Sequence, residues 1–534
     1  AGSALGVLLG ILLGQGLLIL ITQTISDLYV SVNATKLLVT PWQVLKGVGI
    51  TLLAVLAATL APALEAARVQ PVFVYRISHL EQTGQRMSRW FMLAGFVCMA
   101  LSPLLIAASG RSLIIGFMAL FLFIVGYSLV VPAVIKGVLR WLQRIPSYSL
   151  YQRMTLRGVQ ASLSRTSLAI VALTVAVSAT VGVSIMIGSF RASVADWLED
   201  TLQSDLYISA TSINSSRIQG TLDPQWLQRV QTLPDVASVS TGRNARLEVD
   251  GVTVPMLVLQ PGEHSGRGFE YLYGDRDDIW RAFLEEDVLL VSEPFAYHHQ
   301  VQAGDNITVQ SGEAGSINLE IAGVYQDYSA TQGMVVLPRR TYEKYWADRG
   351  ISTIGLMLNE EADVAALAQQ LQSWAGNSSE AVLVRSNKTI RDFSLKVFDR
   401  TFAITNVLRV LVVIVAFVGV FSALMALFLE KGREYSILRA TGITPGQLQR
   451  LVLLQSALIG LLAGLLSLPL GWIMSDILIE VINRRSFGWT MQSYFFVSLP
   501  FQALLLSVLA ALLAGLYPTR RISRISLSDG LRSL

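Results

Sequence analysis

The 534-residue sequence has little charge, one cysteine and four histidines, and each scarcity excludes a class of protein. Only 15% of its residues are charged, against about 25% in ordinary soluble domains, and 52% are hydrophobic, which excludes a plain water-soluble globule. The single Cys98 excludes an internal disulfide framework. The apolar content excludes a disordered chain, and a net charge of +4 gives no support for nucleic-acid binding. Composition therefore predicts an integral membrane protein.

Several short motifs that carry chemistry are also absent. The sequence contains no phosphate loop of the form G-x-x-x-x-G-K-[ST], no G-x-S-x-G elbow and no H-E-x-x-H pair. We therefore expect no ATP site of the usual kind, no catalytic residue, no metal and no cofactor in this chain. His298 and His299 are adjacent and form a candidate metal pair, but the exposed end of a helix is the favoured interpretation.

Long apolar runs occupy most of the chain outside one central segment. A helix needs roughly 20 apolar residues to cross a hydrocarbon core, and eight runs reach about that length. Between residues 191 and 400 the sequence is instead rich in Asp, Glu, Gln, Ser and Gly, which predicts an independently folded α+β domain. The predicted fold is an α-helical polytopic membrane protein with an inserted α+β extracytoplasmic domain. The predicted spans are 2–22, 44–64, 90–108, 112–139, 166–190, 402–429, 451–482 and 496–517.

Alternating apolar patterns predict the strands of the inserted domain, and 3.6-residue periodicity predicts its helices. The aromatic residues of 268–280 form either a docking surface for an outer partner or, more simply, part of the domain core. The stretches 205–209 and 382–386 are expected to bring the chain out of the membrane and back to it. The expected strands are 252–259, 287–291, 306–310, 318–325 and 333–337, the expected helices are 224–232, 339–346 and 361–374, and the aromatic residues are Phe269, Tyr271, Tyr273 and Trp280.

Arginine and lysine gather in alternate loops, which sets the orientation because positive flanks stay in the cytoplasm. Four segments, 65–89, 136–165, 430–450 and 518–534, hold most of the basic residues that flank the spans. The opposite loops offer only Lys36, Arg111, Arg484 and Arg485. We therefore expect both ends of the chain in the cytoplasm and the large domain outside it.

The end of the second span and the end of the last span share a pattern. Leu, Pro, Arg and Arg recur at the same spacing in both, and two glycine pairs are spaced alike. The interpretation is an internal duplication whose first copy is incomplete, so that this chain would be the C-terminal portion of a longer polypeptide; the alternative is that any span ends in Pro and Arg. The matching residues are Leu60, Pro62, Arg68 and Arg76 with Leu516, Pro518, Arg524 and Arg532, and Gly6 and Gly10 with Gly460 and Gly464.

Small residues and arginines mark two further features. Gly6, Gly10 and Gly14 recur every four residues on the first span, a spacing that lets helices approach closely in lipid, as expected also of Gly460 and Gly464. A substrate groove is the minority interpretation. Residues 148–165 form a helical wheel with a narrow polar stripe, and Arg153 and Arg157 on it are expected to anchor an interfacial helix on lipid phosphates. The alternative is a simple positive flank.

The segment 430–450 is the most informative one. It reads EKGREYSILRATGITPGQLQR, with Gly442 placed as a helix C-cap and Pro445 as the first residue of the next helix. A short helix between two spans at the cytoplasmic side has the shape of a docking element. Composition alone favours a solvated loop over such a docking element.

Here the sequence resembles a known family. The string R-E-x-x-I-L-R-A-x-G, together with the glycine-containing span after it and the "DGLR" tail, is similar to the signature of FtsX-like ABC transporter permeases, the macrolide-exporter and lipoprotein-releasing type of the mechanotransmission superfamily. The resemblance covers 149–534 as one four-span unit, 2–76 as the end of another and 90–139 as a linker pair of a duplicated ten-span form. Residues carrying the string are Arg433, Glu434, Ile437, Leu438, Arg439, Ala440 and Gly442.

The resemblance implies a mechanism and a set of partners. A separate cytoplasmic ABC ATPase dimer, binding ATP and Mg²⁺, would dock on the string, with its charged residues as contacts and Ile437 and Leu438 as the apolar anchor. Its closure would move the spans and the outer domain of a multi-pass protein in the bacterial inner membrane. Membrane lipid and an extracytoplasmic protein, soluble or lipid-anchored, are the other expected partners. The chain itself is expected not to be an enzyme.

The resemblance also divides the chain. The expected units are 1–76 (end of the first permease unit), 77–147 (two linker spans), 148–190 (interfacial helix and first span of the second unit), 191–400 (extracytoplasmic domain) and 401–534 (last three spans, with the coupling helix at 430–450).

Three functions compete. The leading one is export, or extraction from the membrane, of a hydrophobic or amphiphilic substrate such as a lipid, lipoprotein, peptide or drug. The second is a transmembrane signalling scaffold that regulates an outer partner enzyme without transport. The third is an ion-driven transporter, which needs charges at mid-membrane. The spans are almost free of such charges, and Asp476 and Glu480 are expected to lie at a solvated helix end.

Overall fold

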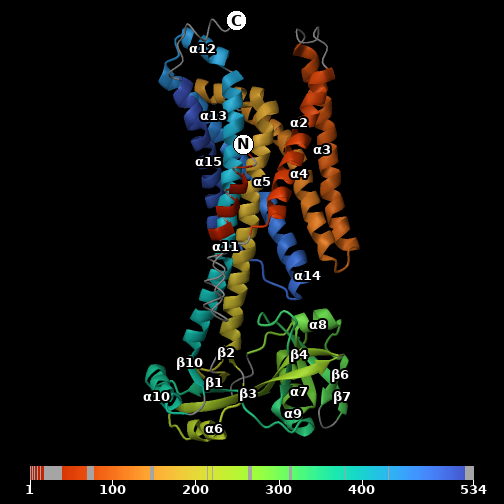
Figure 1. Ribbon diagram of the computed structural model, residues 1–534, viewed down its shortest axis with the longest axis vertical. Coiled ribbons are helices and arrows are strands. Elements are labelled where there is room, and N and C mark those ends of the chain that lie inside the picture. The colour runs from red at the N-terminus through yellow and green to blue at the C-terminus, as the bar shows by residue number, and fades with distance from the viewer. Residues whose placement is uncertain are drawn as a thin grey trace.

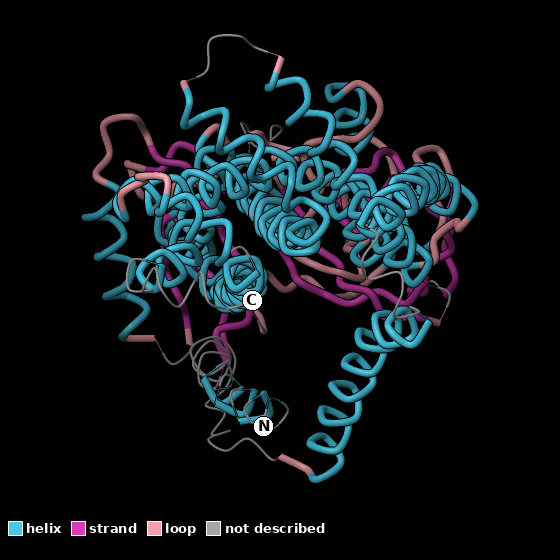
Figure 2. Tube along the Cα trace, turned by 90° about the horizontal axis from the view of Figure 1, so that it is seen from above, coloured by secondary structure: helices cyan, strands magenta, loops and turns pink. Residues whose placement is uncertain are grey.

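The computed structural model describes residues 39–68, 77–144, 149–212, 215–218, 220–249, 251–262, 268–311, 315–378, 381–430 and 432–522, with part of 2–18. Long helices occupy most of its length, and a domain built on a mixed sheet lies at one end (Figure 1). Viewed along the long axis, the helices gather over the strands (Figure 2).

The long helices match the predicted spans where the structure describes them. Six stretches are long and apolar enough to cross a membrane: Arg89–Ala108, Leu113–Gln143, Thr166–Thr201, Asn387–Leu427, Pro445–Phe487 and Ser498–Tyr517. These confirm six of the eight expected spans. The expected span 44–64 lies within α2 (Pro41–Arg68), and much of 2–22 lies outside the described residues. The remaining long helices are α3 (Ile77–Ala108), α4 (Leu113–Gln143), α5 (Leu150–Thr201), α11 (Asn387–Glu430), α13 (Pro445–Asp476) and α15 (Ser498–Ile522).

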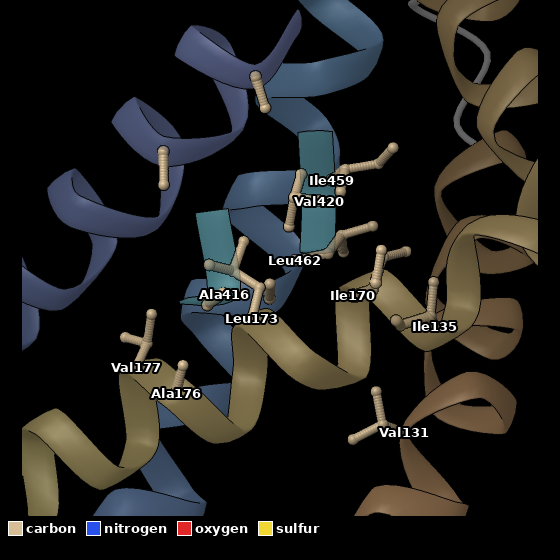
Figure 3. Close-up of a cluster of buried hydrophobic side chains, with 14 of the residues drawn as sticks. Val131, Ile135, Ile170, Leu173, Ala176, Val177, Ala416, Val420, Ile459 and Leu462 are labelled. Atoms are coloured by element: carbon tan, nitrogen blue, oxygen red, sulfur yellow. The ribbon is translucent and has the colours of Figure 1, made fainter. Parts of the chain in front are cut away.

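The helical part has one extended apolar core. Helices α5, α11, α13 and α15 meet in it, and α4 packs against its side (Figure 3). Because lipid is as apolar as these side chains, close packing rather than the hydrophobic effect holds such a bundle together. Representative members are Val131 and Ile135 of α4, Ile170 and Leu173 of α5, Ala416 and Val420 of α11, Ile459 and Leu462 of α13, and Ala510 and Ala514 of α15.

Glycines allow the closest helix contacts. A Cβ atom added to Gly460 would lie 2.7 Å from the carbonyl oxygen of Ser507 on α15, and one added to Gly464 would collide with the Ser507 hydroxyl. A Cβ on Gly471 of α13 would lie 2.8 Å from Val181 of α5. Helix α13 therefore touches both neighbours almost backbone to backbone.

Helix α5 differs from its expected division into an interfacial helix and a span. It is one helix of 52 residues that begins at a capping box, in which Ser149 and Gln152 cap each other's backbone N–H groups. No proline interrupts it, so nothing breaks the helix near residue 165. Its last turns, 191–201, and the first turns of α11, 387–400, were assigned to the polar domain on composition but are helical.

The sheet domain lies between these two helices in the chain. Its strand order is β10-β1-β9-β3-β4-β8-β5-β7-β6, with β2 paired to β1. Neighbours are antiparallel except β4–β8 and β5–β7, which are parallel. The strands are β1 (Leu206–Ser212), β2 (Ser215–Ile218), β3 (Val236–Val249), β4 (Val252–Gln260), β5 (Val288–Ser292), β6 (Asn306–Ser311), β7 (Gly315–Tyr325), β8 (Val335–Pro338), β9 (Thr353–Leu358) and β10 (Val382–Ser386).

Five helices accompany the sheet, and the α+β prediction is confirmed. All five expected strands and all three expected helices are present within a few residues, and the expected entry and exit stretches 205–209 and 382–386 form β1 and β10, whereas β2, β3, β9 and α7 were not expected. The aromatic residues Phe269, Tyr271 and Trp280 pack around buried Phe283, so they belong to the core, while Tyr273 is 72% exposed. The helices are α6 (Pro224–Gln231), α7 (Arg276–Glu285), α8 (Glu293–His299), α9 (Arg339–Tyr345) and α10 (Val364–Gly376).

The two connections to the bundle are joined where they enter the sheet. Strands β1 and β10 pair antiparallel, with Leu206 opposite Ser386. The backbone N–H of Asn387 donates to the carbonyl of Asp205 at 2.9 Å, and its side chain donates to the carbonyl of Leu202 at 2.6 Å. The end of α5 and the start of α11 are therefore held side by side.

The glycine contacts give a first prediction. Gly464→Leu should lower the free energy of unfolding by about 1–3 kcal/mol, because the added side chain forces α15 away from α13. Gly419→Leu on α11 is the matched control, since no atom lies within 4 Å of a Cβ built there. Thermal unfolding in detergent measures both variants; equal loss in the two would contradict the packing role of Gly464.

Candidate functional site

A short helix connects α11 to α13 at the end of the bundle opposite the sheet domain (Figure 1). Helix α12 (Gly432–Ala440) contains six of the seven residues of the string proposed for coupling, and Gly442 follows it. The helix expected within 430–450 is therefore present, and it has a fixed orientation.

The turn after α12 is rigidly defined. Gly442 has a φ of +102°, its N–H donates to Arg439 O at 3.1 Å, and the Ile443 N–H donates to Leu438 O at 3.1 Å. This pair of bonds is a Schellman motif, which needs a residue with positive φ and explains the glycine. Thr444 then caps α13 in a reciprocal pair with Gln447. The exit from α12 thus leads directly into a membrane span.

One face of α12 packs onto the bundle and the other faces outward. Tyr435 is buried and Leu438 packs beside it, against a cluster formed by Leu448, Leu451 and Val452 of α13 with Met154 of α5. Ile437 is 46% exposed, and Glu434 and Ala440 are also exposed. The expected apolar anchor pair is therefore divided: Ile437 points outward and Leu438 points into the bundle.

The remaining residues of the string have mixed positions. Arg439 is half-buried and interacts with another group of the protein. The surroundings of the Arg433 side chain lie outside the described residues. The outward face available to a partner therefore consists of Glu434, Ile437 and Ala440, spaced i, i+3 and i+6 on one side of the helix.

A small polar cavity lies directly beneath α12. Its volume of about 20 Å³ is close to that of one water molecule, and residues of α5, α11, α12, α13 and α15 line it. Its polar lining comes from Ser162, Tyr435, Gln455 and Ser456, and Gly515 leaves room for the Ser456 hydroxyl. Helix α12 therefore rests on a part of the bundle that is not completely filled by side chains.

Two other predicted features can be placed. Arg153 and Arg157 are exposed, one turn apart on the first turns of α5, and their binding to lipid phosphates stays a prediction. No described atom lies within 4 Å of a Cβ built on Gly6 or Gly10, so the stripe proposed for helix packing has no neighbour there among the described residues.

The stalk, defined here as 187–201 of α5 with 387–403 of α11, joins the bundle to the sheet domain. Arg191 forms two bonds to the Asp399 carboxylate, at 2.7 and 3.2 Å, and Arg391 pairs with Glu199 at 3.0 Å. These pairs are exposed and contribute at most about 1 kcal/mol each. The ring of Phe190 lies 5.0 Å from that of Phe398, which adds an apolar contact.

The outer loop, residues 484–497 between α13 and α15, is clamped by the sheet domain. The Glu293 carboxylate, at the start of α8, accepts bonds from Thr490 N at 2.9 Å and from Thr490 Oγ1 at 3.1 Å. On the other side, Tyr328 Oη donates to the carbonyl of Thr490 at 2.9 Å. Burial raises the pKa of the Glu293 carboxyl, while its bonds from Thr490 and the charge of Arg484 oppose that rise.

The same loop also contacts α5 and the turn between α3 and α4. Trp489 is buried against Phe190, Tyr328 and Ile479. Arg485 donates to the carbonyls of Ile106 and Ser112. The outer loop therefore joins three parts of the molecule that are distant in sequence.

A seven-residue π-helical segment, Ile477–Asn483, leads into the outer loop. Segments of this kind occur mostly as single-turn irregularities inside α-helices, frequently at functional sites.

Arg111, in the α3–α4 turn, contacts the sheet domain. Its guanidinium lies 4.3 Å from the centre of the Tyr297 ring of α8 and donates a hydrogen bond to the Tyr297 backbone carbonyl at 2.5 Å. This contact connects the domain to the spans in addition to the stalk and the outer loop.

Sequence reasoning did not find this clamp. Glu293 and Thr490 are 197 residues apart, and no periodicity marks either one. The expected helix end at His298 and His299 is confirmed: His298 lies 3.2 Å from the carbonyl of Thr331, and His299 stacks on Phe295. Within the described residues, no group of three or more His, Cys, Asp or Glu is placed to hold a metal ion.

Comparisons with known proteins agree with this architecture. Residues 166–374 match the model of the MacB-like periplasmic core domain, and residues 406–527 match that of the FtsX-like permease C-terminal domain. An ABC transporter permease protein of Mycobacterium tuberculosis, itself uncharacterized, is 36% identical over 539 residues. The match covers 99% of this chain and 63% of the relative, so the chain spans less than two thirds of that protein's length.

Two solved structures are also similar over about a third of the chain. The periplasmic region of MacB from Actinobacillus actinomycetemcomitans is 14% identical with a TM-score of 0.26, covering 37% of this chain and 94% of that one. The extracellular domain of the ABC-type transporter YknZ from Gram-positive bacteria is 11% identical with a TM-score of 0.24, covering 34% and 100%.

The two family models and the relative together cover both the membrane spans and the inserted domain. They indicate a multi-pass inner-membrane protein whose sheet domain is periplasmic. The chain therefore carries an FtsX-like permease C-terminal domain and a MacB-like periplasmic core domain, and over nearly its whole length it is similar to an ABC transporter permease.

Proposed function

We propose that this chain transmits the conformational cycle of a separate cytoplasmic ABC ATPase dimer to its periplasmic domain, and so drives export or membrane extraction of a hydrophobic or amphiphilic substrate. ATP and Mg²⁺ would be bound by the ATPase and not by this chain. The permease would then act as a mechanical element without catalytic residues of its own.

The observation that carries the proposal is the unbroken length of α5. At about 1.5 Å per residue, its 52 residues span about 78 Å, which is longer than a bilayer is thick. The helix begins beside the cluster under α12 and ends in the stalk. A displacement at the cytoplasmic end therefore has a stiff path to the periplasmic domain.

Helix α12 is the proposed docking element. Its inward residues connect it to α13 and α5, and only the residue between Glu430 and Gly432 separates it from α11. Force applied to its outward face would therefore reach three spans at once. For the ATPase cycle to do work through this contact, the ATPase must bind two states of the membrane part with different affinity.

The periplasmic end has two attachments that respond to such movement. The stalk follows α5 and α11, whereas the Glu293–Thr490 clamp follows the outer loop between α13 and α15. Relative movement of these helix pairs would tilt the domain or open the clamp. The domain would thereby be the moving part that acts on the substrate.

The docking proposal predicts that Ile437→Asp abolishes stimulation of the co-expressed ATPase. A charge at an apolar anchor should weaken binding by about tenfold or more, whereas the exposed position leaves the fold intact. ATPase activity of the purified complex and the melting temperature of the permease are the two measurements.

Trp141→Asp is the control, because Trp141 is 63% exposed on α4 near the same side of the membrane. Full stimulation by the Ile437→Asp variant would contradict docking at α12. Stimulation without any release of amphiphile from proteoliposomes would favour the regulatory scaffold over a transporter.

The clamp gives a separate prediction. Glu293→Ala leaves the Thr490 N–H without its acceptor, so hydrogen exchange of residues 488–494 should rise while ATPase affinity stays unchanged. Substrate release per ATP hydrolysed should fall, because movement is no longer passed through the outer loop. Glu285→Ala, an exposed carboxylate of the same domain, is the control. Unchanged exchange and unchanged release would show that the clamp plays no part.

A further inference from the structure

One charged side chain lies inside the apolar part of α11. Arg409 follows Phe402 by seven residues, or about 10 Å along the helix, and Phe402 contacts Phe190 at the outer end of the predicted span. An ionisable group at this depth is costly and is by default a functional-site candidate. None of the functions argued above uses it.

Arg409 lies on the face of α11 that packs against the bundle. It is seven residues from Phe402 and seven from Ala416, and both of these pack on that face. Its guanidinium is only partly satisfied: Nη1 donates to Asn406 Oδ1 at 3.1 Å, while Nε is buried without a hydrogen-bond partner. No carboxylate of the described residues forms an ion pair with it. The site has a cation and donor capacity to spare.

An open cleft lies on the outer side of Arg409, and its nearest lining residue along α11 is Ala403. It has a volume of about 520 Å³ and lies between the two stalk helices, with Ala403 at its membrane end. Asn406, which accepts the hydrogen bond from Arg409, lies about one helical turn further into the membrane than Ala403. Three cations and two carboxylates line the cleft: Arg191, Lys396 and Arg400 with Asp392 and Asp399.

Further into the membrane than the cleft, α11 presents an exposed aliphatic stripe. Val410 follows Ala403 by seven residues and so lies beneath it, and Ile414 and Val418 continue at intervals of four. These side chains are 59%, 52% and 56% exposed. These three features follow one another from the membrane surface inward: a polar cleft, a cation one to two helical turns deeper, and an apolar stripe. They match, in that order, the headgroup, the phosphate and the acyl chain of a lipid.

We propose that this surface binds one anionic phospholipid or similarly phosphorylated amphiphile from the outer leaflet. The phosphate contacts Arg409 and Asn406, the headgroup fills the cleft, and an acyl chain lies along Val410, Ile414 and Val418. The inference rests on the proposed function, in which such an amphiphile is the substrate class. Charge complementarity selects the occupant, because the cleft carries a net positive charge and Arg409 has no acidic partner among the residues that the structure describes.

The test is photocrosslinking of lipids to the full-length protein in proteoliposomes. Photoreactive phosphatidylglycerol should label residues 403–418 about tenfold more than photoreactive phosphatidylcholine. Arg409→Gln should abolish that preference, and Arg409→Lys should keep part of it. Arg484→Gln, which removes an exposed cation of the outer loop on the same side of the membrane, should leave the preference unchanged.

Three results would overturn the proposal. They are equal labelling by the two lipids, labelling that Arg409→Gln does not alter, and displacement of the lipid by millimolar inorganic phosphate, which would indicate a site for free anions. The Ile437→Asp variant separates this proposal from the coupling proposal, because it should lose ATPase stimulation while keeping the lipid preference.

Discussion

The constraint on which the structure depends is that backbone polar groups in hydrocarbon must pair within their own segment. The protein meets it with helices, and α5 and α11 continue as helices beyond the membrane into the sheet domain. Because the same hydrogen-bonding pattern continues through both environments, no flexible linker lies between bundle and stalk along either helix. Under the proposed function, this continuity would let the sheet domain respond to movements at the cytoplasmic side. It also explains why the stalk needs only modest ion pairs and the Phe190 contacts to stay closed.

The bundle combines rigid and adjustable contacts. Backbone approaches at Gly460, Gly464 and Gly471 fix α13 against its neighbours, because nothing between them can be compressed. Beneath α12 the same helices leave a polar, water-sized cavity. At the opposite end, the outer loop holds the domain by hydrogen bonds to a single residue, Thr490. Tight packing at mid-membrane with looser contacts at both ends is the arrangement expected of helices that move as rigid bodies.

The stalk and Arg409 both involve the helix pair α5 and α11. Arg409 lies on α11 seven residues inside Phe402, which contacts Phe190 of α5, so a rearrangement of these two helices changes what the guanidinium can reach. A bound anionic lipid would stabilise whichever arrangement offers it the most contacts. Substrate and ATPase would then act on the same pair of helices from opposite sides of the membrane. Such reciprocity is what linkage between two binding sites requires.

What the sequence by itself determined is everything that follows from local pattern. Apolar length gave the spans, arginine distribution gave the orientation, and Gly442 with Thr444 and Pro445 gave the turn after α12, because each rests on neighbours within a few residues. Strands with clear alternation were predicted, while β3 and β9 were missed because their mixed polar pattern makes sense only as central strands of this sheet.

Tertiary structure alone decided which residues of α12 point outward and which face the bundle. Ile437 and Leu438 are adjacent in sequence and equally apolar, yet only the packing of α12 on α13 separates their roles. The clamp of Glu293 on Thr490, and the position of Arg409 without an ion pair among the described residues, depend on helices brought together from distant parts of the chain. Contacts of that kind arise from three-dimensional packing, which no local pattern records.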